Sequence, residues 1–145
     1  HHAVVYTNDV NLSLRSRIIQ QYEGYESYTM IARSALVTPS SKIAGGCALM
    51  EGAIVNGAIL AQNSVINTKA VIEHGCILGN NVFVGPGAIV CGDTCIGDNV
   101  LVGAGVIIRD GIEITENVTI GMGSVVVRSI VEPGVYLGNP CRKIR

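Results

Sequence analysis

The chain has 145 residues and a formal net charge of −1; 48% of its residues are hydrophobic, only 4% are aromatic, and tryptophan is absent. The near-neutral charge argues against nucleic acid or an anionic membrane surface as a partner, and no apolar run approaches the roughly 18 residues of a membrane span. We therefore expect one domain with a fragment of another, packed by aliphatic side chains, and a cytoplasmic protein, since no signal peptide is visible.

The N-terminal segment, residues 1–30, lacks the repeat that dominates the rest of the chain. Residues 3–6 are β-like. Residues 10–22 have apolar residues near helical spacing, preceded by an N-cap that Asn8 and Asp9 can supply. Residues 28–31 are typical of a strand. We interpret residues 1–30 as one βαβ unit from the C-terminal part of a small α/β domain, and we expect it to cover one end of the structure that follows.

A six-residue period begins near residue 31 and continues to about residue 131. From Ile54 to Val125, twelve consecutive hexapeptides open with Ile, Leu or Val and carry a small or β-branched residue four positions later. A fixed hexapeptide period predicts a parallel β-helix, in which three hexapeptides close one triangular coil of about 18 residues. We expect five to six coils, with the first and fifth positions of each hexapeptide pointing inward.

Stacking of the coils predicts columns of like residues one coil apart in sequence, with a rise of roughly 4.8 Å per coil. One such column is predicted to contain Ile54, Ile72, Val90, Ile108 and Val126. The frame slips by one residue near residues 51–56, which we interpret as a deletion at a corner. At the C-terminus, residues 132–145 form a turn, a short strand and a basic tail, which we expect to cover the other open end.

The five cysteines are scattered. Cys47 and Cys76 occupy inward positions and should act as small hydrophobic residues. Cys91 and Cys95 have neither CxxC spacing nor a histidine partner in sequence, so we predict no metal site. The pattern is typical of reduced cytosolic thiols.

Among the three histidines, only His74 lies inside the repeat. Flat apolar faces on a triangular prism favour a homotrimer with clefts between prisms, and His74 occupies an outward position. Gly92 follows it by one coil of the repeat, and Asn56 precedes it by one coil. Stacking thus places a neutral imidazole over a backbone without a side chain, where a slim acyl-thioester arm would fit and the Gly92 amide could meet an oxyanion. The alternative is a solvated surface histidine.

Two stretches carry a family resemblance: INTKAVIEHGCILGNNVFVGPGAIVCG (residues 66–92) and the ending GNPCRKIR. They resemble the bacterial left-handed β-helix acetyltransferases, and more narrowly the nucleotide-amino-sugar N-acetyltransferases and sialic-acid O-acetyltransferases. Residues 6–43 resemble the last βαβ unit of that family's sugar-nucleotide-binding domain. The resemblance implies an all-β, left-handed parallel β-helix at residues 31–131. It also implies a homotrimer that transfers acetyl from acetyl-CoA to an amine or hydroxyl of a sugar, such as a nucleotide-linked amino sugar, without a metal.

The resemblance also implies roles for individual residues. His74 matches the general base, Asn67 a polar residue of the same pocket, and Gly92 the glycine whose amide meets the thioester carbonyl. Asn8 and Asp9 match the loop that contacts the sugar nucleotide. The residues that correspond to the wall along pantetheine are Gly103, Ala104, Gly105, Gly121, Met122 and Gly123. Those that could meet the CoA phosphates are Arg142, Lys143 and Arg145.

Three positions depart from the family pattern. Gly75 stands where Asp or Glu usually follows the base, and Phe83 and Ala32 stand where further histidines are common. Loss of the carboxylate should leave His74 less basic and less fixed unless another acid, such as Glu73 or one from a neighbouring subunit, replaces it. These departures favour the alternative of a catalytically decayed trimeric scaffold or binding module.

Two other enzymes with this repeat are alternatives. One is a hexapeptide acyltransferase that acts on serine or a simple sugar. The other is a γ-class carbonic anhydrase, which needs three zinc-binding histidines, whereas His74 alone lies within the repeat.

Overall fold

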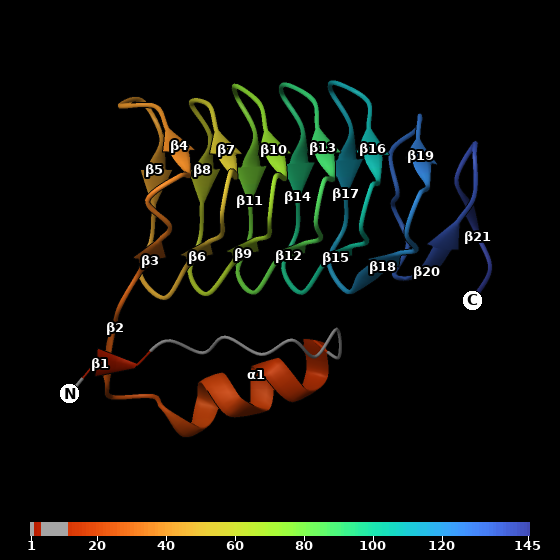
Figure 1. The fold of residues 1–145 in the computed structure, drawn as a ribbon. Helices are drawn as coiled ribbons and strands as arrows, with labels where there is room; N and C mark the ends of the chain where they lie inside the picture. The colour runs from red at the N-terminus through yellow and green to blue at the C-terminus, as the bar shows by residue number, and fades with distance from the viewer. Residues whose placement is uncertain (1, 4–11) are drawn as a thin grey trace.

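The computed structural model describes residues 2–3 and 12–145. In these residues, three sheets of very short strands form the walls of a long prism (Figure 1). The strands within each wall are parallel, apart from the last strand of one sheet. The predicted parallel β-helix is confirmed.

The three walls are named sheets I, II and III in the order in which each coil visits them. Sheet I contains β3 (Met30–Ile31), β6 (Ala48–Leu49), β9 (Val65–Ile66), β12 (Phe83–Val84), β15 (Leu101–Val102), β18 (Val118–Ile120), β20 (Gly134–Leu137) and β21 (Arg142–Lys143). Sheet II contains β4 (Leu36–Val37), β7 (Ile54–Val55), β10 (Val71–Ile72), β13 (Ile89–Val90), β16 (Ile107–Ile108) and β19 (Val125–Val126). Sheet III contains β5 (Lys42–Ile43), β8 (Ile59–Leu60), β11 (Ile77–Leu78), β14 (Cys95–Ile96) and β17 (Glu113–Ile114).

The interior of the prism is filled as the repeat predicts. All twelve small or β-branched residues at the fifth positions are buried, and so are the residues that open the hexapeptides, apart from Ile54. Small residues are required there because the three walls approach closely near the corners. Each fully buried aliphatic side chain contributes roughly 1.5–3 kcal/mol, so the columns stabilise the coil stack.

The exception at Ile54 locates the frame slip. Ile54 pairs with Val71, while Val55 pairs with Ile72, so the predicted column is wrong at its first member: Val55 takes the place assigned to Ile54. The shortened corner comprises residues 56–58, slightly later than predicted. Gly57 turns there with a φ of 68°, which a glycine adopts without strain. The remaining pairs of the column, from Ile72 to Val126, are confirmed.

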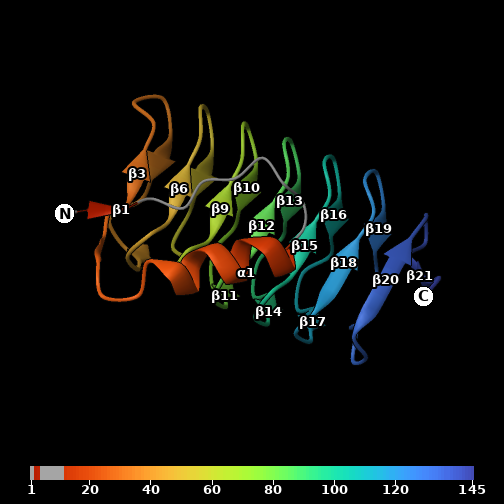
Figure 2. The ribbon, with the colours of Figure 1, turned by 90° about the horizontal axis from the view of Figure 1, so that it is seen from below.

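In residues 2–3 and 12–30 the N-terminal segment does not cover an end of the β-helix, so the expectation is wrong for these residues. Helix α1 (Leu12–Gln21) lies along the outer face of sheet I, parallel to the long axis (Figures 1 and 2). The physical reason is an apolar row on that face that needs burial. The row contains Ala48, Val65, Phe83 and Leu101, with Leu12, Met30 and Met50 packed against it.

The expected strand–helix–strand order is present, with shifted bounds. β1 (His2–Ala3) pairs in parallel with β2 (Glu26–Ser27), the strand that follows α1 in the chain. The strand expected at residues 28–31 is instead β3, which begins sheet I of the β-helix. The assignment of this segment to a small α/β domain stays a prediction.

Arg15 of α1 anchors the helix to the prism. Its side chain is completely buried. Nε donates a hydrogen bond to Asn81 Oδ1 at 2.9 Å, and Nη2 donates to the carbonyl of Asn63 at 2.8 Å. Asn63 and Asn81 both have φ near +60°, as the corners between sheets III and I require, and asparagine tolerates this conformation well.

The C-terminal tail closes the other end of the prism, as predicted. β20 adds to β18 in parallel, and β21 folds back against β20 in antiparallel orientation (Figure 1). Within the described residues, no helix is long and apolar enough to cross a membrane.

Candidate active site

His74 lies in the corner that joins β10 of sheet II to β11 of sheet III, and its side chain is exposed. A Cβ atom at Gly92 would lie 2.7 Å from His74 Cε1 and 3.0 Å from Nε2. The predicted placement of the imidazole over Gly92 is therefore confirmed. The ring itself fills the space above Gly92, so a thioester arm has to approach from beside this pair and not between its members.

The residue before His74 is held by the preceding coil. The Asn56 side-chain amide donates to Glu73 Oε2 at 2.9 Å, and the same oxygen lies 3.4 Å from the backbone nitrogen of His74. Asn56 thus aligns with Glu73, one residue away from the predicted match with His74, because the corner at residues 56–58 is shortened. No hydrogen bond joins the Glu73 carboxylate to the imidazole in the part of the chain that the structure describes.

Asn67 lies in a different corner, the one that joins sheet I to sheet II. A cavity of about 460 Å³ opens there. It is lined by Asn67, Phe83, Gly85, Pro86, Leu101, Gly103, Ala104, Thr119, Ile120, Gly121 and Met122. The cavity unites Asn67 with four of the six residues predicted to form the pantetheine wall; the other two, Gly105 and Gly123, lie in the same corners.

Glycines keep the predicted pantetheine wall, called the glycine wall below, free of side chains. A Cβ atom at Gly103 would lie 2.6 Å from the backbone nitrogen of Met122, and one at Gly85 would lie 2.7 Å from the nitrogen of Ala104. Any side chain at these positions would therefore collide with the backbone of the next coil. Phe83 and Leu101 form the apolar floor of the cavity. The sequence analysis did not predict this floor. The two residues are one full coil apart in sequence, and this spacing could have indicated that they stack on the same face.

One chain does not bring all the predicted residues together. His74 and Gly92 lie in the corner between sheets II and III, whereas Asn67 and the glycine wall lie in the corner between sheets I and II. The face of sheet II separates the two groups. A site that uses both groups requires a second copy of the chain.

Comparisons with known proteins agree with this fold and repeat. A family model described as bacterial transferase hexapeptide (six repeats) matches residues 93–128. The acetyltransferase domain of PglB from Neisseria gonorrhoeae FA1090 is 30% identical, with a TM-score of 0.91, over 97% of this chain and 70% of that one. The chain belongs to the hexapeptide-repeat acetyltransferases.

Other solved structures show the same architecture. PerB from Caulobacter crescentus, in complex with CoA and GDP-perosamine, is 27% identical over 99% of this chain and 70% of that one, with a TM-score of 0.91. The PglB domain has also been solved with acetyl coenzyme A. WeeI from Acinetobacter baumannii AYE, at 19% identity and a TM-score of 0.72, shares the fold. No curated protein sequence matches the chain.

Two basic residues of this acetyltransferase's C-terminal tail interact with other groups of the same chain. Lys143 Nζ forms an ion pair with Glu132 Oε2 at 2.8 Å. Hydrogen bonding to Glu132 raises the pKa of Lys143, and the same hydrogen bond lowers the pKa of Glu132. Arg142 Nη1 donates to the carbonyl of Cys141 at 2.9 Å. Asn8 and Asp9, predicted to contact the sugar nucleotide, lie outside the described residues.

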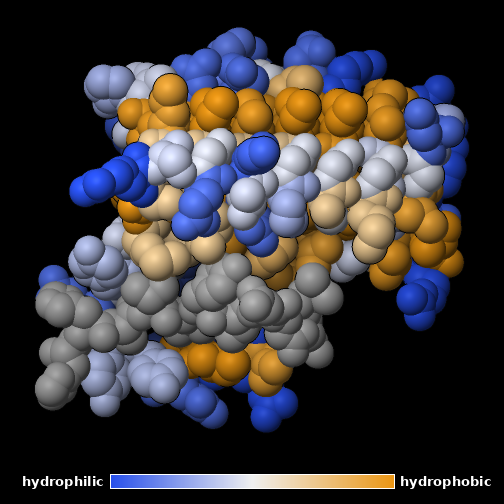
Figure 3. Space-filling view, viewed as in Figure 1, coloured by the Kyte–Doolittle hydropathy of each residue, from blue (hydrophilic) through white to orange (hydrophobic). Residues whose placement is uncertain are grey.

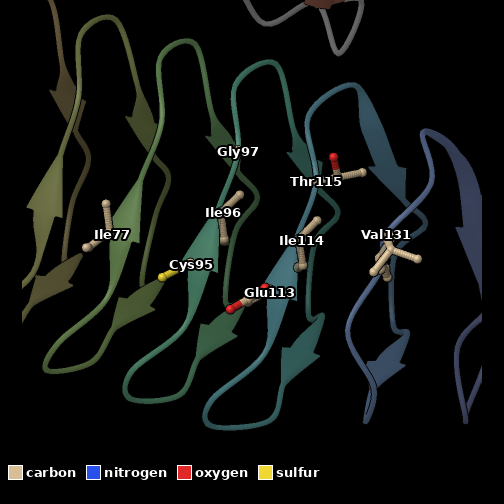
Figure 4. A pocket seen from close by; sticks show the side chains of 9 residues that line it. Ile77, Cys95, Ile96, Gly97, Glu113, Ile114, Thr115 and Val131 are labelled. Atoms are coloured by element: carbon tan, nitrogen blue, oxygen red, sulfur yellow. The ribbon is translucent and has the colours of Figure 1, made fainter.

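A second hollow, of about 420 Å³, lies on the outer face of sheet III (Figure 4). Ile77, Cys95 and Glu113 line it from successive coils. Ile77 belongs to the strand that follows the His74 corner, so this face adjoins the histidine. Sequence reasoning missed the hollow, although these residues share the outward sixth position of their hexapeptides.

Two of the cysteines, Cys47 and Cys76, are buried in the core. Burial raises the pKa of the Cys47 and Cys76 thiols, which keeps them protonated and unreactive. Within the described residues, no group of three or more His, Cys, Asp or Glu side chains is placed to hold a metal ion.

Proposed function

We propose that this chain transfers the acetyl group of acetyl-CoA to the amine of a nucleotide-linked amino sugar, with His74 as the general base. The observation that carries the proposal is the exposed imidazole lying directly over Gly92 in an outward corner. Relatives of the same architecture support the substrates, because they were solved with acetyl coenzyme A, or with CoA and GDP-perosamine. Two further structures of the perosamine enzyme carry a substitution of one histidine.

We further propose that three copies complete the site by packing their sheet II faces around a threefold axis. The outward row of sheet II is aliphatic in every coil and contains Leu36, Ile54, Val71, Ile89, Ile107 and Val125. Leu36 is 55% and Ile107 42% exposed in the single chain. A hydrophobic row of this kind runs along the length of the prism (Figure 3). A continuous aliphatic row of exposed and half-buried side chains indicates an interface.

This arrangement joins the two halves of the site. A face turned toward the axis places its two flanking corners against the corners of the neighbours. The His74 corner of one chain then meets the Asn67 corner of the next. Both corners belong to the same coil, so a threefold axis parallel to the prism brings them to the same height. The cleft between them has the glycine wall on one side and the imidazole on the other.

In this cleft His74 accepts a proton from the amine as its nitrogen attacks the thioester carbonyl. The backbone N–H of Gly92 has no hydrogen-bond partner among the described residues, so it is free to stabilise the oxyanion of the tetrahedral intermediate. Collapse of the intermediate breaks the carbon–sulfur bond, and the proton held by His74 passes to the departing thiolate. The products are an amide and CoA.

The cavity beside Asn67 suits the pantetheine arm. It is mainly apolar and flattened by glycines, and its row of corners leads toward the C-terminal hairpin. There Arg142 is exposed and Lys143 is paired with Glu132. Arg142 therefore offers more free positive charge for CoA phosphates than Lys143 does.

The test is release of CoA thiol from acetyl-CoA with a panel of nucleotide-linked amino sugars, compared between wild type and His74→Ala. We expect turnover with at least one sugar and a loss of at least 100-fold in the variant. The melting temperature should stay unchanged, because the side chain is exposed. Full activity of His74→Ala, or no turnover by wild type with any amino sugar, would overturn the proposal.

A further inference from the structure

The row of corners that contains His74 continues to the C-terminal end of the prism. Gly92, Asp110 and Arg128 follow His74 at intervals of one coil, as the pairing of the strands before them shows. Arg128 is exposed and lies in the corner that follows β19, next to the hairpin of β20 and β21. The row therefore leads from the proposed base to an exposed arginine.

A hollow of about 240 Å³ lies between this last corner and the C-terminal hairpin. Three basic residues line it, Arg128 from the corner and Arg142 and Lys143 from β21. Ser129 lines it as well. Its Oγ accepts a hydrogen bond from the N–H of Glu113 at 3.1 Å, so its own O–H is left to donate. The hollow thus gathers the positive charge and the hydrogen-bond donors that a phosphate group requires.

The two arginines of this hollow keep their charge available. In the part of the chain that the structure describes, no ion pair or side-chain hydrogen bond engages Arg128, and Arg142 donates only to the backbone carbonyl of the residue before it. Lys143, by contrast, is paired with Glu132. Asp110 lies one coil from Arg128 and forms no ion pair with it among the described residues. The two guanidinium groups are therefore free to bind an anion.

The distance along the row matches the length of a pantetheine arm. Arg128 lies two coils beyond Gly92, and the hairpin adds one further layer. At roughly 4.8 Å per coil, the hollow lies roughly 10–14 Å from Gly92 along the prism. Pantetheine has about as many bonds between its sulfur and the first phosphorus of CoA as four residues of extended backbone, which span roughly 14 Å. A thioester at Gly92 therefore brings the first phosphates of CoA to the hollow.

We propose that the hollow lined by Arg128 and Arg142 binds the diphosphate of CoA, and that it belongs to the chain that supplies His74. This inference rests on the proposed function, which places the thioester at Gly92. Guanidinium groups suit a diphosphate because their planar N–H donors bind phosphate oxygens in pairs. In the proposed trimer the glycine wall of the neighbouring chain lines the other side of the arm, so CoA contacts both chains.

Calorimetry of CoA binding tests this inference with Arg128→Gln and the control Arg33→Gln. Arg33 is also exposed, but it lies in the first coil, at the opposite end of the prism. We expect Arg128→Gln to weaken CoA binding about tenfold, the usual effect of one hydrogen bond to a charged group. Arg33→Gln should bind CoA as wild type does. Both melting temperatures should stay unchanged, because the side chains are exposed.

Two truncated ligands identify the phosphates involved. Dephospho-CoA lacks the 3′-phosphate and keeps the diphosphate, so Arg128→Gln should weaken its binding about tenfold as well. Pantetheine lacks every phosphate, and its binding, followed by ligand-observed NMR, should be the same in variant and wild type. The inference is overturned if the variant keeps wild-type affinity for CoA, if the loss is absent with dephospho-CoA, or if pantetheine suffers an equal loss.

Binding and turnover together separate this inference from the proposed function. If CoA binding depends on Arg128 but no amino sugar is acetylated, the phosphate site stands and the proposed function fails. If amino sugars are acetylated while Arg128→Gln binds CoA like wild type, the phosphate site fails and the proposed function stands. A wild-type chain that binds no CoA would overturn both.

Discussion

At the scale of single residues, the proposed site depends on glycines, which leave open the space that a side chain would fill. Gly92 leaves room for the His74 ring, and Gly103 leaves the wall flat enough for a slim ligand. The offset of one coil was sufficient to predict the first pair, because stacked coils place such residues one above the other. Sequence could not show that the ring itself fills the space over Gly92, since that depends on its rotamer.

Gly92→Ala should displace His74 while preserving the fold. The added Cβ would lie 2.7 Å from His74 Cε1, so the ring has to swing away from the position over the free N–H. We expect a loss of about 10- to 100-fold in kcat, measured by CoA thiol release. Cys95→Ala, also on the outer surface, is the control. Unchanged turnover in Gly92→Ala would show that this ring position is not used in catalysis.

At the scale of elements, the repeat predicts the inward columns because nothing but aliphatic and small side chains fits between three close walls. The slip was misplaced because the sequence around Ile54 and Val55 offers two aliphatic residues that can open the same hexapeptide. The position of α1 was missed for another reason. The outward residues Ala48, Val65, Phe83 and Leu101 form one apolar row, which is evident only when the outward positions of successive coils are compared.

Val84→Asp should abolish folding. Val84 is fully buried in β12, and an unpaired carboxylate there costs several kcal/mol, a large share of the stability of a single domain. Circular dichroism and soluble yield check this. Cys95→Asp, at an exposed outward position of β14, is the matched control and should fold. A soluble, cooperatively melting Val84→Asp protein would contradict the assigned inward frame.

At the scale of the whole molecule, one chain holds the residues of the proposed site in two separate corners. Sequence placed Asn67 and His74 in a single pocket because their roles came from a resemblance, which does not say which corner each residue occupies. The structure assigns the corners, and the aliphatic row of sheet II indicates how copies join them.

Ile89→Glu should dissociate the proposed trimer, because it places a charge in the centre of the sheet II row. Analytical ultracentrifugation should show a smaller species, with far-UV circular dichroism unchanged. Ile77→Glu, on the outer face of sheet III and 48% exposed, is the control and should remain a trimer. Dissociation by Ile77→Glu and not by Ile89→Glu would assign the interface to sheet III instead.

The most direct test of a shared site is complementation between two inactive variants. His74→Ala and Asn67→Ala chains are mixed under conditions that exchange subunits, and CoA release is measured. If each site takes His74 from one chain and Asn67 from the next, random trimers at equal ratio contain intact sites at about a quarter of their interfaces, and activity returns to about that fraction of wild type. If the mixture stays as inactive as its components after subunit exchange is verified, the site lies within one chain and the account is contradicted.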